Sequence, residues 1–272
     1  MKAYLDLVKE VLENGVCREN RTGTNTIMLF GYHYKINLQH GFPLLTTKKV
    51  FFKSIIRELL WYLSGETHIR NLRKHTKIWD DWTSEDKNWE VGRMYGYQWV
   101  KWEKYQKDSK TGELKCTFIN QIQQVIDEIK SNPNSRRLVV TAWNPSVLDE
   151  VALPSCHSFF IFNVTNGKLN CHLTQRSGDI ALGIPFNLAC YSVLTHMIAK
   201  ETSLDVGEFS HYINDAHIYV NHIDGLKEQI SRKPKILPKL EIADKSFWDL
   251  KFEDFSLKNY NYHPKIKFPV AV

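Results

Sequence analysis

Apolar residues recur at the spacing of a helix in some segments of the chain and at nearly alternating positions in others. The helical pattern covers residues 3–14, 53–63, 118–129, 188–199 and 221–231. Runs typical of extended strands cover residues 25–38, 138–140, 159–162, 169–173 and 207–219. Because helices and strands follow one another without a regular order, the pattern predicts an α+β fold. Helices should cover one face of a mostly antiparallel or mixed sheet.

Local signals mark the ends of several elements. Asn132-Pro133 ends the helix of residues 118–129, since the residue before a proline disfavours helical backbone. Asn166-Gly167 predicts a tight hairpin turn between two strands. Residues 103–116 are rich in Lys, Glu and Gly and show little periodicity, so we expect a variable surface excursion there. No linker divides the chain, and we predict a single domain over residues 1–272.

Composition narrows the class of protein. Hydrophobic residues make up 43% of the chain, but no apolar run approaches the ~20 residues that span a bilayer, so no membrane association is expected. The N-terminal segment lacks the long apolar region of a signal peptide, which favours a cytoplasmic location. Five cysteines without CxxC spacing favour reduced thiols over disulfides or a metal site. The net charge of +6 suits an anionic ligand, and the basic residues are too scattered for nucleic acid to be the expected primary ligand.

Cys156 is the first candidate for chemistry, and it stands before His157 at the start of an apolar strand. One interpretation is a buried structural thiol. The other is a nucleophile, whose pKa the arginines at positions 136, 137 and 176 would lower if they fold nearby. His157 is a poor base for it, because adjacent side chains of a strand point to opposite faces. A cysteine hydrolase with another histidine as base stays open.

Five residues together suggest an anion site, namely Arg21, Arg136, Arg137, Arg176 and Ser177. Singly, each arginine is typical of a surface salt bridge. Together with Ser177 they could form a phosphate clamp, since the guanidinium fork matches phosphate oxygens in two-point contacts. The run that begins at Arg21 is not a Walker loop, because its glycine and lysine spacing is wrong.

Three polar residues have both structural and ligand-binding interpretations. Asn187 stands where a helix should begin, so it suits a helix cap. Its amide both donates and accepts, so it equally suits reading one edge of a pyrimidine ring. His217 and Tyr219 share one face of a strand, where they could bond a sugar hydroxyl or find partners in the core.

Glu58 lies on the apolar helix of residues 53–63. A carboxylate there must either reach water or have a raised pKa, and a raised pKa suits proton transfer. Trp79 and Trp82 are typical of core positions, although they could also flank a flat heterocycle.

These residues lie in segments that resemble the thymidylate synthase family along essentially the whole chain. The matching segments are Arg21-Thr22-Gly23-Thr24, Phe42-Pro43-Leu44-Leu45-Thr46-Thr47-Lys48, Glu58-Leu59-Leu60-Trp61, Ile78-Trp79-Asp80, Tyr95-Gly96, Ser135-Arg136-Arg137, Pro154-Ser155-Cys156-His157, Gln175-Arg176-Ser177, Leu182-Gly183-Ile184-Pro185-Phe186-Asn187 and Asp215-Ala216-His217-Ile218-Tyr219. So many segments in the same order indicate common descent and not chance.

The resemblance implies a homodimer whose interface is one face of the sheet, and reductive methylation of dUMP by 5,10-methylenetetrahydrofolate without a metal. The residues that it implies for catalysis are Cys156, which adds to carbon 6 of uracil, with Glu58, Tyr95, Asn187 and Asp179. Those that it implies for dUMP are Arg21, Arg176 and Ser177, Arg136 and Arg137 across the dimer interface, and Gln175, Asn187, His217 and Tyr219. Those that it implies for folate are Lys48 at the polyglutamate tail, Ile78, Trp79, Trp82, Asp179, Leu182, Gly183 and Phe186, and the closing residues Ala271 and Val272.

Four positions depart from the family pattern. Ser155 stands where proline is usual before the nucleophile, and could alter how the thiolate is positioned. Ile161 and Asn163 replace a glutamine and a tyrosine, and could alter the dimer sheet. Asn214 replaces a glycine, although asparagine tolerates left-handed backbone better than most residues.

Three other functions remain as alternatives. A pyrimidine nucleotide hydroxymethylase of the same superfamily would let water quench the intermediate. Asn187 argues against its cytosine-directed version, and Trp79 with the tail of residues 269–272 favours exclusion of water. A cysteine hydrolase explains few of the matched segments. A nucleotide- or RNA-binding module would leave Glu58 and Cys156 without roles.

Overall fold

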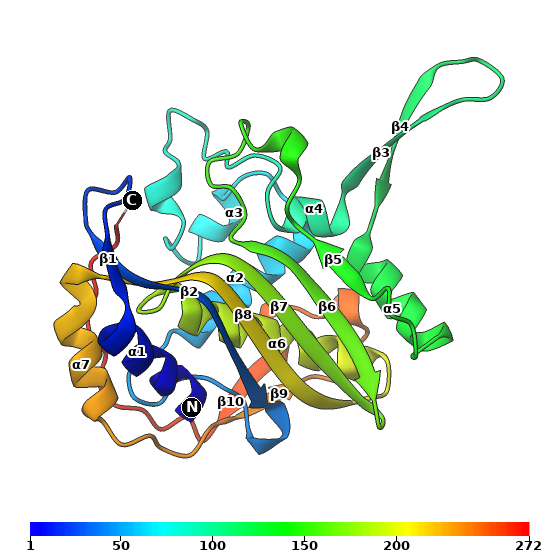
Figure 1. The fold of residues 1–272 in the computed structure, drawn as a ribbon. Helices are drawn as coiled ribbons and strands as arrows, with labels where there is room; N and C mark the ends of the chain where they lie inside the picture. Colours follow the sequence, from blue (N-terminus) through cyan, green and yellow to red (C-terminus); the bar gives the residue numbers. More distant parts are fainter. Residues whose placement is uncertain (272) are drawn as a thin grey trace.

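The centre of the fold is a six-stranded sheet with the strand order β1-β2-β8-β7-β6-β5 (Figure 1). The computed structural model describes residues 1–271. The strands of this sheet are β1 (Val16–Arg18), β2 (Thr26–Asn37), β5 (Val139–Thr141), β6 (His157–Thr165), β7 (Lys168–Asp179) and β8 (Asp205–Tyr219). Strands β7 and β8 run parallel, whereas the other neighbours run antiparallel. The α+β fold with a mixed sheet, predicted from the sequence, is therefore confirmed.

Helix α6 packs against β7 and β8 on one face of this sheet (Figure 1). The α-helices within the described residues are α1 (Lys2–Asn14), α2 (Phe52–Ser64), α3 (Arg70–Arg73), α4 (Gly96–Val100), α5 (Gln121–Ser131), α6 (Gly183–Glu201) and α7 (Ile223–Ser231). The 3-10 helices there are η1 (Leu38–His40), η2 (Asp80–Trp82), η3 (Pro145–Val147), η4 (Val220–His222), η5 (Phe247–Asp249) and η6 (Phe252–Asp254). Helix α6 is apolar and buried on almost every side, as expected for a helix at the centre of a core.

Two predicted helix boundaries differ from the structure. Phe118 lies in an exposed strand, and α5 begins after Asn120, whose side chain accepts a hydrogen bond from the backbone N–H of Gln123. An asparagine cap is therefore the start signal that the apolar spacing alone missed. Helix α6 begins at Gly183, so Asn187 lies in its second turn and is not a helix cap.

The predicted surface excursion is a regular antiparallel hairpin. Strand β3 (Trp102–Lys107) pairs with β4 (Leu114–Ile119), and the two project away from the rest of the chain (Figure 1). The excursion expected over residues 103–116 is thus an ordered ribbon, and it carries exposed Tyr105, Leu114 and Phe118. A second ribbon is formed by β9 (Lys239–Ile242) and β10 (Phe255–Lys258).

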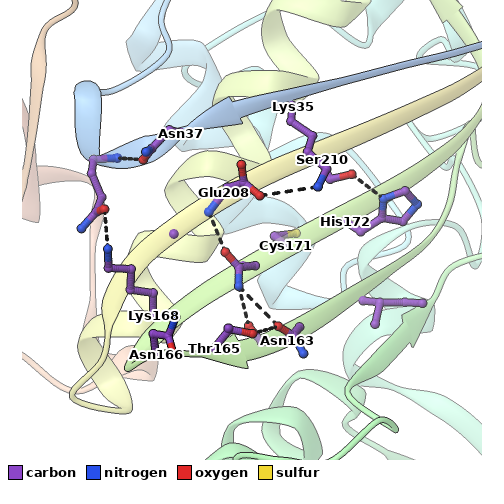
Figure 2. A pocket seen from close by; sticks show the side chains of 14 residues that line it. Lys35, Asn37, Asn163, Thr165, Asn166, Lys168, Cys171, His172, Glu208 and Ser210 are labelled. Carbon is purple, nitrogen blue, oxygen red and sulfur yellow. Dashed lines mark hydrogen bonds and ion pairs between the residues drawn. The ribbon is translucent and has the colours of Figure 1, made fainter.

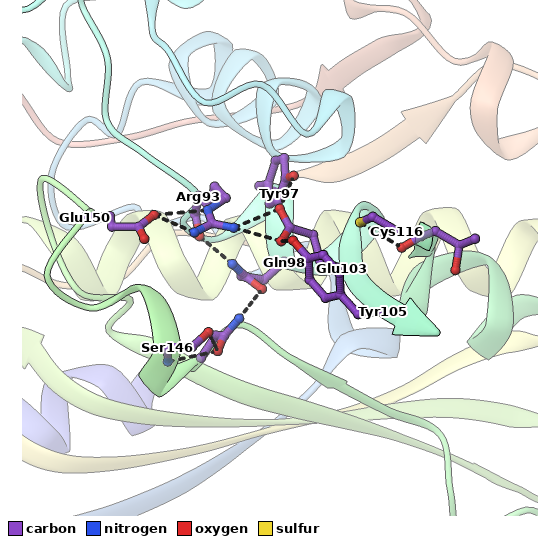
Figure 3. A network of polar contacts seen from close by, with 10 residues as sticks. Arg93, Tyr97, Gln98, Glu103, Tyr105, Cys116, Ser146 and Glu150 are labelled. Carbon is purple, nitrogen blue, oxygen red and sulfur yellow. Dashed lines mark hydrogen bonds and ion pairs between the residues drawn. The ribbon is translucent and has the colours of Figure 1, made fainter. Parts of the chain in front are cut away.

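A polar network holds the base of the β3–β4 hairpin (Figure 3). Arg93 Nη1 donates to both carboxylate oxygens of Glu103, at 2.8 Å each, and its Nη2 donates to Glu150. The hydroxyls of Tyr97 and Tyr105 donate to Glu103, at 2.9 and 2.7 Å. Because one carboxylate accepts from three side chains, the hairpin leaves the core in a defined direction.

The predicted hairpin turn at Asn166-Gly167 is confirmed. Both residues have positive φ, 51° and 71°, and they connect the paired residues Thr165 and Lys168. Two consecutive positive φ values give the turn that matches the twist of the flanking strands.

The buried hydrophobic side chains form one cluster that extends from α1 to Phe268. No helix within residues 1–271 is long and apolar enough to cross a membrane. All five cysteines are free thiols. The single domain over residues 1–272 stays a prediction.

Candidate active site

The ends of three strands bring several of the predicted site residues to one end of the sheet. Cys156 directly precedes β6, and the backbone N–H of Arg176 donates to its carbonyl oxygen at 2.8 Å. The parallel register of β7 and β8 places Ser177 beside Asp215, and Asp179 beside His217. Residues far apart in sequence therefore meet because strands of one sheet end together.

Arg176 holds the turn that carries Cys156. Its Nε donates to the carbonyl of Ser155 at 3.1 Å, and its Nη2 donates to the carbonyl of Pro154 at 2.6 Å. The guanidinium is thereby fixed against the turn that carries the thiol. The arginine that the sequence suggests for phosphate thus also orders the backbone around Cys156.

The surroundings of the Cys156 thiol shift its pKa in both directions. Burial raises its pKa, while Arg176, a contact with Tyr95 and the charge of Arg21 act in the opposite direction with smaller effect. Arg176 therefore acts on this pKa in the expected direction, but the effect of burial is larger. Arg136 and Arg137, which that expectation included, are exposed and lie between α5 and β5.

His157 does not serve as a base for Cys156. It is buried, and burial lowers its pKa to about 4. Its ring packs between Tyr95 and Tyr191, at centroid distances of 5.0 and 5.3 Å. The side chain therefore points into the core, as the alternation along a strand predicts.

Ser155 and Tyr95 form a two-point clamp around Cys156. The backbone N–H of Tyr95 donates to Ser155 Oγ at 3.2 Å, and the backbone N–H of Cys156 donates to the Tyr95 hydroxyl at 2.8 Å. Tyr95 has a φ of 34°, which is rare for a residue with a bulky side chain. A proline at position 155 would offer no acceptor to this buried N–H, so the serine has a specific partner.

We expect Ser155→Ala to lower the free energy of unfolding by about 1–3 kcal/mol, because the N–H of Tyr95 loses its buried acceptor. Urea unfolding followed by circular dichroism measures the change. Ser158→Ala is the matched control, since Ser158 lies on the adjoining strand and is only half-buried. Equal losses in the two variants would contradict the clamp.

Glu58 lies on helix α2. It is buried, and Trp79 Nε1 donates to its Oε1 at 2.8 Å. Burial raises the pKa of Glu58 to about 7, although hydrogen bonds from Trp79 and Tyr62 partly oppose this. Of the two outcomes that the apolar helix leaves open, Glu58 therefore shows burial with a raised pKa and does not reach water.

Trp79 lies between Glu58 and Tyr95. Its ring lies 5.9 Å from that of Tyr95 and 5.3 Å from that of Trp82, centroid to centroid. Ile78, the residue before it, is half-buried. The predicted acid, Trp79, Tyr95 and Cys156 therefore form a continuous series of contacts.

Asn187 faces the end of β7 from helix α6. Gln175 Nε2 donates to its Oδ1 at 3.0 Å and to the carbonyl of Ser177 at 2.8 Å. Two residues that the sequence did not single out continue this series, His211 beside Gln175 and Tyr34 beside His211. Their only signal in the sequence is a polar atom at an inward position of a strand.

The end of β8 presents His217 and Tyr219 together. Asp215 Oδ1 accepts from His217 Nδ1 at 2.8 Å, so this carboxylate orients the imidazole. The rings of His217 and Tyr219 meet edge to face at 5.3 Å. Burial raises the pKa of Tyr219, and Asp179 acts in the same direction while Thr22 and Arg21 oppose it, which places the Arg21 loop nearby.

A cavity of about 270 Å³ lies beside the start of α6. Its lining combines apolar side chains with a cluster of lysines, namely Lys48, Lys49, Val50, Phe51, Ala181, Leu182, Pro185, Phe186, Lys265, Ile266, Lys267 and Phe268. Lys48 is buried, donates to the carbonyl of Ala181, and lies 4.5 Å from the centre of the Phe268 ring. Burial lowers its pKa to about 8, although the charge of Asp179 raises it.

Asp179 and His222 hold two backbone segments near this cavity. Asp179 Oδ1 accepts from the backbone N–H groups of Ala181 and Leu182, at 2.8 and 3.2 Å. His222 Nε2 donates to the carbonyl of Pro269 at 2.7 Å and so anchors the C-terminal segment. Ala271 is half-buried, and the predicted closing residue Val272 lies outside the described residues.

The sheet face opposite α6 carries an open hollow of about 530 Å³ (Figure 2). Polar side chains from four strands line most of it, and the departures Ile161 and Asn163 are among the lining residues. Asn170 bridges two strands by donating to Asn163 and accepting from the N–H of Glu208. Asn214, the other departure on the sheet, does not adopt left-handed backbone.

One comparison with known families bears on this arrangement. A family model with the description "Thymidylate synthase" matches residues 2–272. The match covers every segment that contributes a side chain to the site at the end of the sheet.

Proposed function

The chain belongs to the thymidylate synthase family, and on this basis we propose that it converts dUMP to dTMP with 5,10-methylenetetrahydrofolate, which becomes dihydrofolate. The family binds dUMP and a folate, and its members are transferases of nucleotide biosynthesis. The observation that supports the proposal is the placement of Cys156, which Arg176 and Tyr95 hold against the end of β7, where Gln175 donates to the amide oxygen of Asn187. A soft nucleophile next to a cation and a base-reading amide suits a pyrimidine nucleotide.

In the proposed mechanism Cys156 forms a bond from Sγ to carbon 6 of uracil, and carbon 5 gains the electron pair of the ring double bond. Asn187 holds the edge of the ring, and Glu58 moves protons to and from it. Burial raises the pKa of the thiol, so we propose that its proton passes to solvent as the sulfur attacks. Carbon 5 then takes up the one-carbon unit and afterwards loses its own proton, and Sγ leaves as a thiolate that regains a proton, which restores the ring double bond.

The proposed phosphate site consists of Arg21, Arg176 and Ser177, with Arg136 and Arg137 of the partner subunit. His217 and Tyr219 would contact the ribose. The folate, when bound, supplies the one-carbon unit and the hydride. The cavity of about 270 Å³ suits it, because Leu182 and Phe186 offer an apolar wall.

The lysines around that cavity support a site for a polyglutamate tail. Lys49, Lys265 and Lys267 line the cavity together with Lys48. Since Lys48 already donates to Ala181, we propose that the other three carry most of the attraction for carboxylates.

We propose that the open sheet face packs against the same face of a second copy. Such a contact would cover the hollow of about 530 Å³ and bring Arg136 and Arg137 toward the partner's site. A homodimer in the cytoplasm stays a prediction on the present observations.

The remaining rival is a nucleotide hydroxymethylase, because it shares the family features. Incubation of the purified protein with dUMP and 5,10-methylenetetrahydrofolate distinguishes the two. We expect dihydrofolate, seen as rising near-ultraviolet absorbance. Modified nucleotide without dihydrofolate would indicate hydroxymethylation, and no turnover would overturn the proposal.

A further inference from the structure

A series of buried hydrogen bonds connects strand β2 to the amide of Asn187. The Tyr34 hydroxyl lies 2.8 Å from His211 Nδ1, and His211 Nε2 lies 2.9 Å from Gln175 Oε1. Gln175 Nε2 then donates to Asn187 Oδ1 at 3.0 Å. Tyr34, His211 and Gln175 are exposed by 6%, 0% and 2%, so water does not compete for these bonds.

The direction of every bond in this series follows from one backbone atom. The carbonyl oxygen of Ser177 can only accept, and it lies 2.8 Å from the amide end of Gln175, which must therefore be the NH₂ group. The oxygen of Gln175 then faces His211, so His211 Nε2 carries the hydrogen. Burial keeps the pKa of His211 well below its ordinary value, so the ring is neutral and Nδ1 accepts from the Tyr34 hydroxyl.

The same reasoning gives the orientation of the side-chain amide of Asn187. Because the NH₂ group of Gln175 points at it, the atom of Asn187 on that side is an oxygen. An asparagine in free rotation could present oxygen and nitrogen either way round. Here one arrangement satisfies all four side chains, and the reverse would place two donors against each other.

This orientation bears on which pyrimidine the site accepts. Uracil presents an N–H at ring position 3 and an oxygen at position 4, whereas cytosine presents an acceptor and an NH₂ group at the same places. A fixed amide matches only one of these patterns, and a mismatched buried donor or acceptor loses binding.

We propose that Tyr34 and His211 are positioning residues that, through Gln175, hold the Asn187 amide in the orientation that accepts uracil and rejects cytosine. This inference rests on the proposed function, because it assigns Asn187 to the base. Neither residue touches the ligand, and both lie on strands behind the site.

The test compares Tyr34→Phe with Tyr32→Phe. Tyr32 lies two residues away on the same strand, with its ring 6.4 Å from that of Tyr34, but it is half-buried and outside the series. Dissociation constants for dUMP and dCMP are measured by calorimetry. We expect Tyr34→Phe to lower the preference for dUMP about three- to tenfold, the effect of one neutral hydrogen bond, and Tyr32→Phe to leave it unchanged. Unchanged preference in Tyr34→Phe would overturn the inference.

A second measurement needs no variant. Nitrogen-15 NMR of the unliganded protein should show His211 as the neutral tautomer with hydrogen on Nε2, and hydrogen on Nδ1 instead would contradict the direction of the series. A wild-type protein that binds dUMP no better than dCMP would count against the proposed function. A wild-type protein that discriminates, with an equally selective Tyr34→Phe variant, would count against the inference alone.

Discussion

Replacing Cys156 with alanine should abolish turnover, lowering kcat by at least about 10⁴-fold, because no other group can supply the bond to the ring. The residues proposed for the phosphate and the base remain in place, so dUMP should still bind. Arg176 keeps its contacts with Pro154 and Ser155, since these involve backbone carbonyls. Activity is followed by formation of dihydrofolate, and binding by calorimetry.

Cys17→Ala is the matched control for Cys156→Ala. Cys17 is an exposed thiol on β1, and its replacement should leave kcat within about twofold, since a surface substitution perturbs the fold little. Residual activity near the wild-type level in Cys156→Ala would refute the nucleophile. Loss of dUMP binding as well would mean that the substitution has damaged the site as a whole.

The elements with a strong apolar pattern could be predicted from the sequence, and the weakly patterned ones could not. Helices α1 and α2 were expected within one residue of their observed ends, because their buried faces repeat at helical spacing. The β3–β4 hairpin was missed because both of its faces meet solvent, so burial imposes no alternation on it.

The candidate site was predictable where a residue type conflicts with its surroundings. Glu58 stood out as an acid on an apolar helix, and burial does raise its pKa. The partners of Ser155 and Asn187 were not predictable, because they depend on the register of strands distant in sequence. The net shift in the pKa of Cys156 was not predictable for a related reason, since sequence shows charges such as that of Arg176 but not how much water the fold excludes.

Glu58→Gln should lower kcat by about 10²–10⁴-fold, the usual contribution of a group that transfers a proton. Glutamine keeps an oxygen to accept from Trp79 Nε1, so the side chain should stay in place. Glu66→Gln is a matched control, because Glu66 lies just beyond the end of the same helix and outside the proposed site. Similar losses of kcat in both variants would show that Glu58 has no special part in the chemistry.

The same substitution should make the protein more stable at neutral to alkaline pH. Burial raises the pKa of Glu58 from 4.5 to about 7, so between these values the folded protein holds a proton that the unfolded chain has released. Stability therefore falls as the pH rises through this window, and the cost of burying the charge is fully present above about pH 7. Glutamine carries no charge, so at about pH 8 the variant should gain stability on the order of 3 kcal/mol, and at about pH 4 it should gain almost nothing. Urea unfolding at the two pH values measures the difference, and a gain independent of pH would show that Glu58 does not titrate in the folded protein as its burial requires.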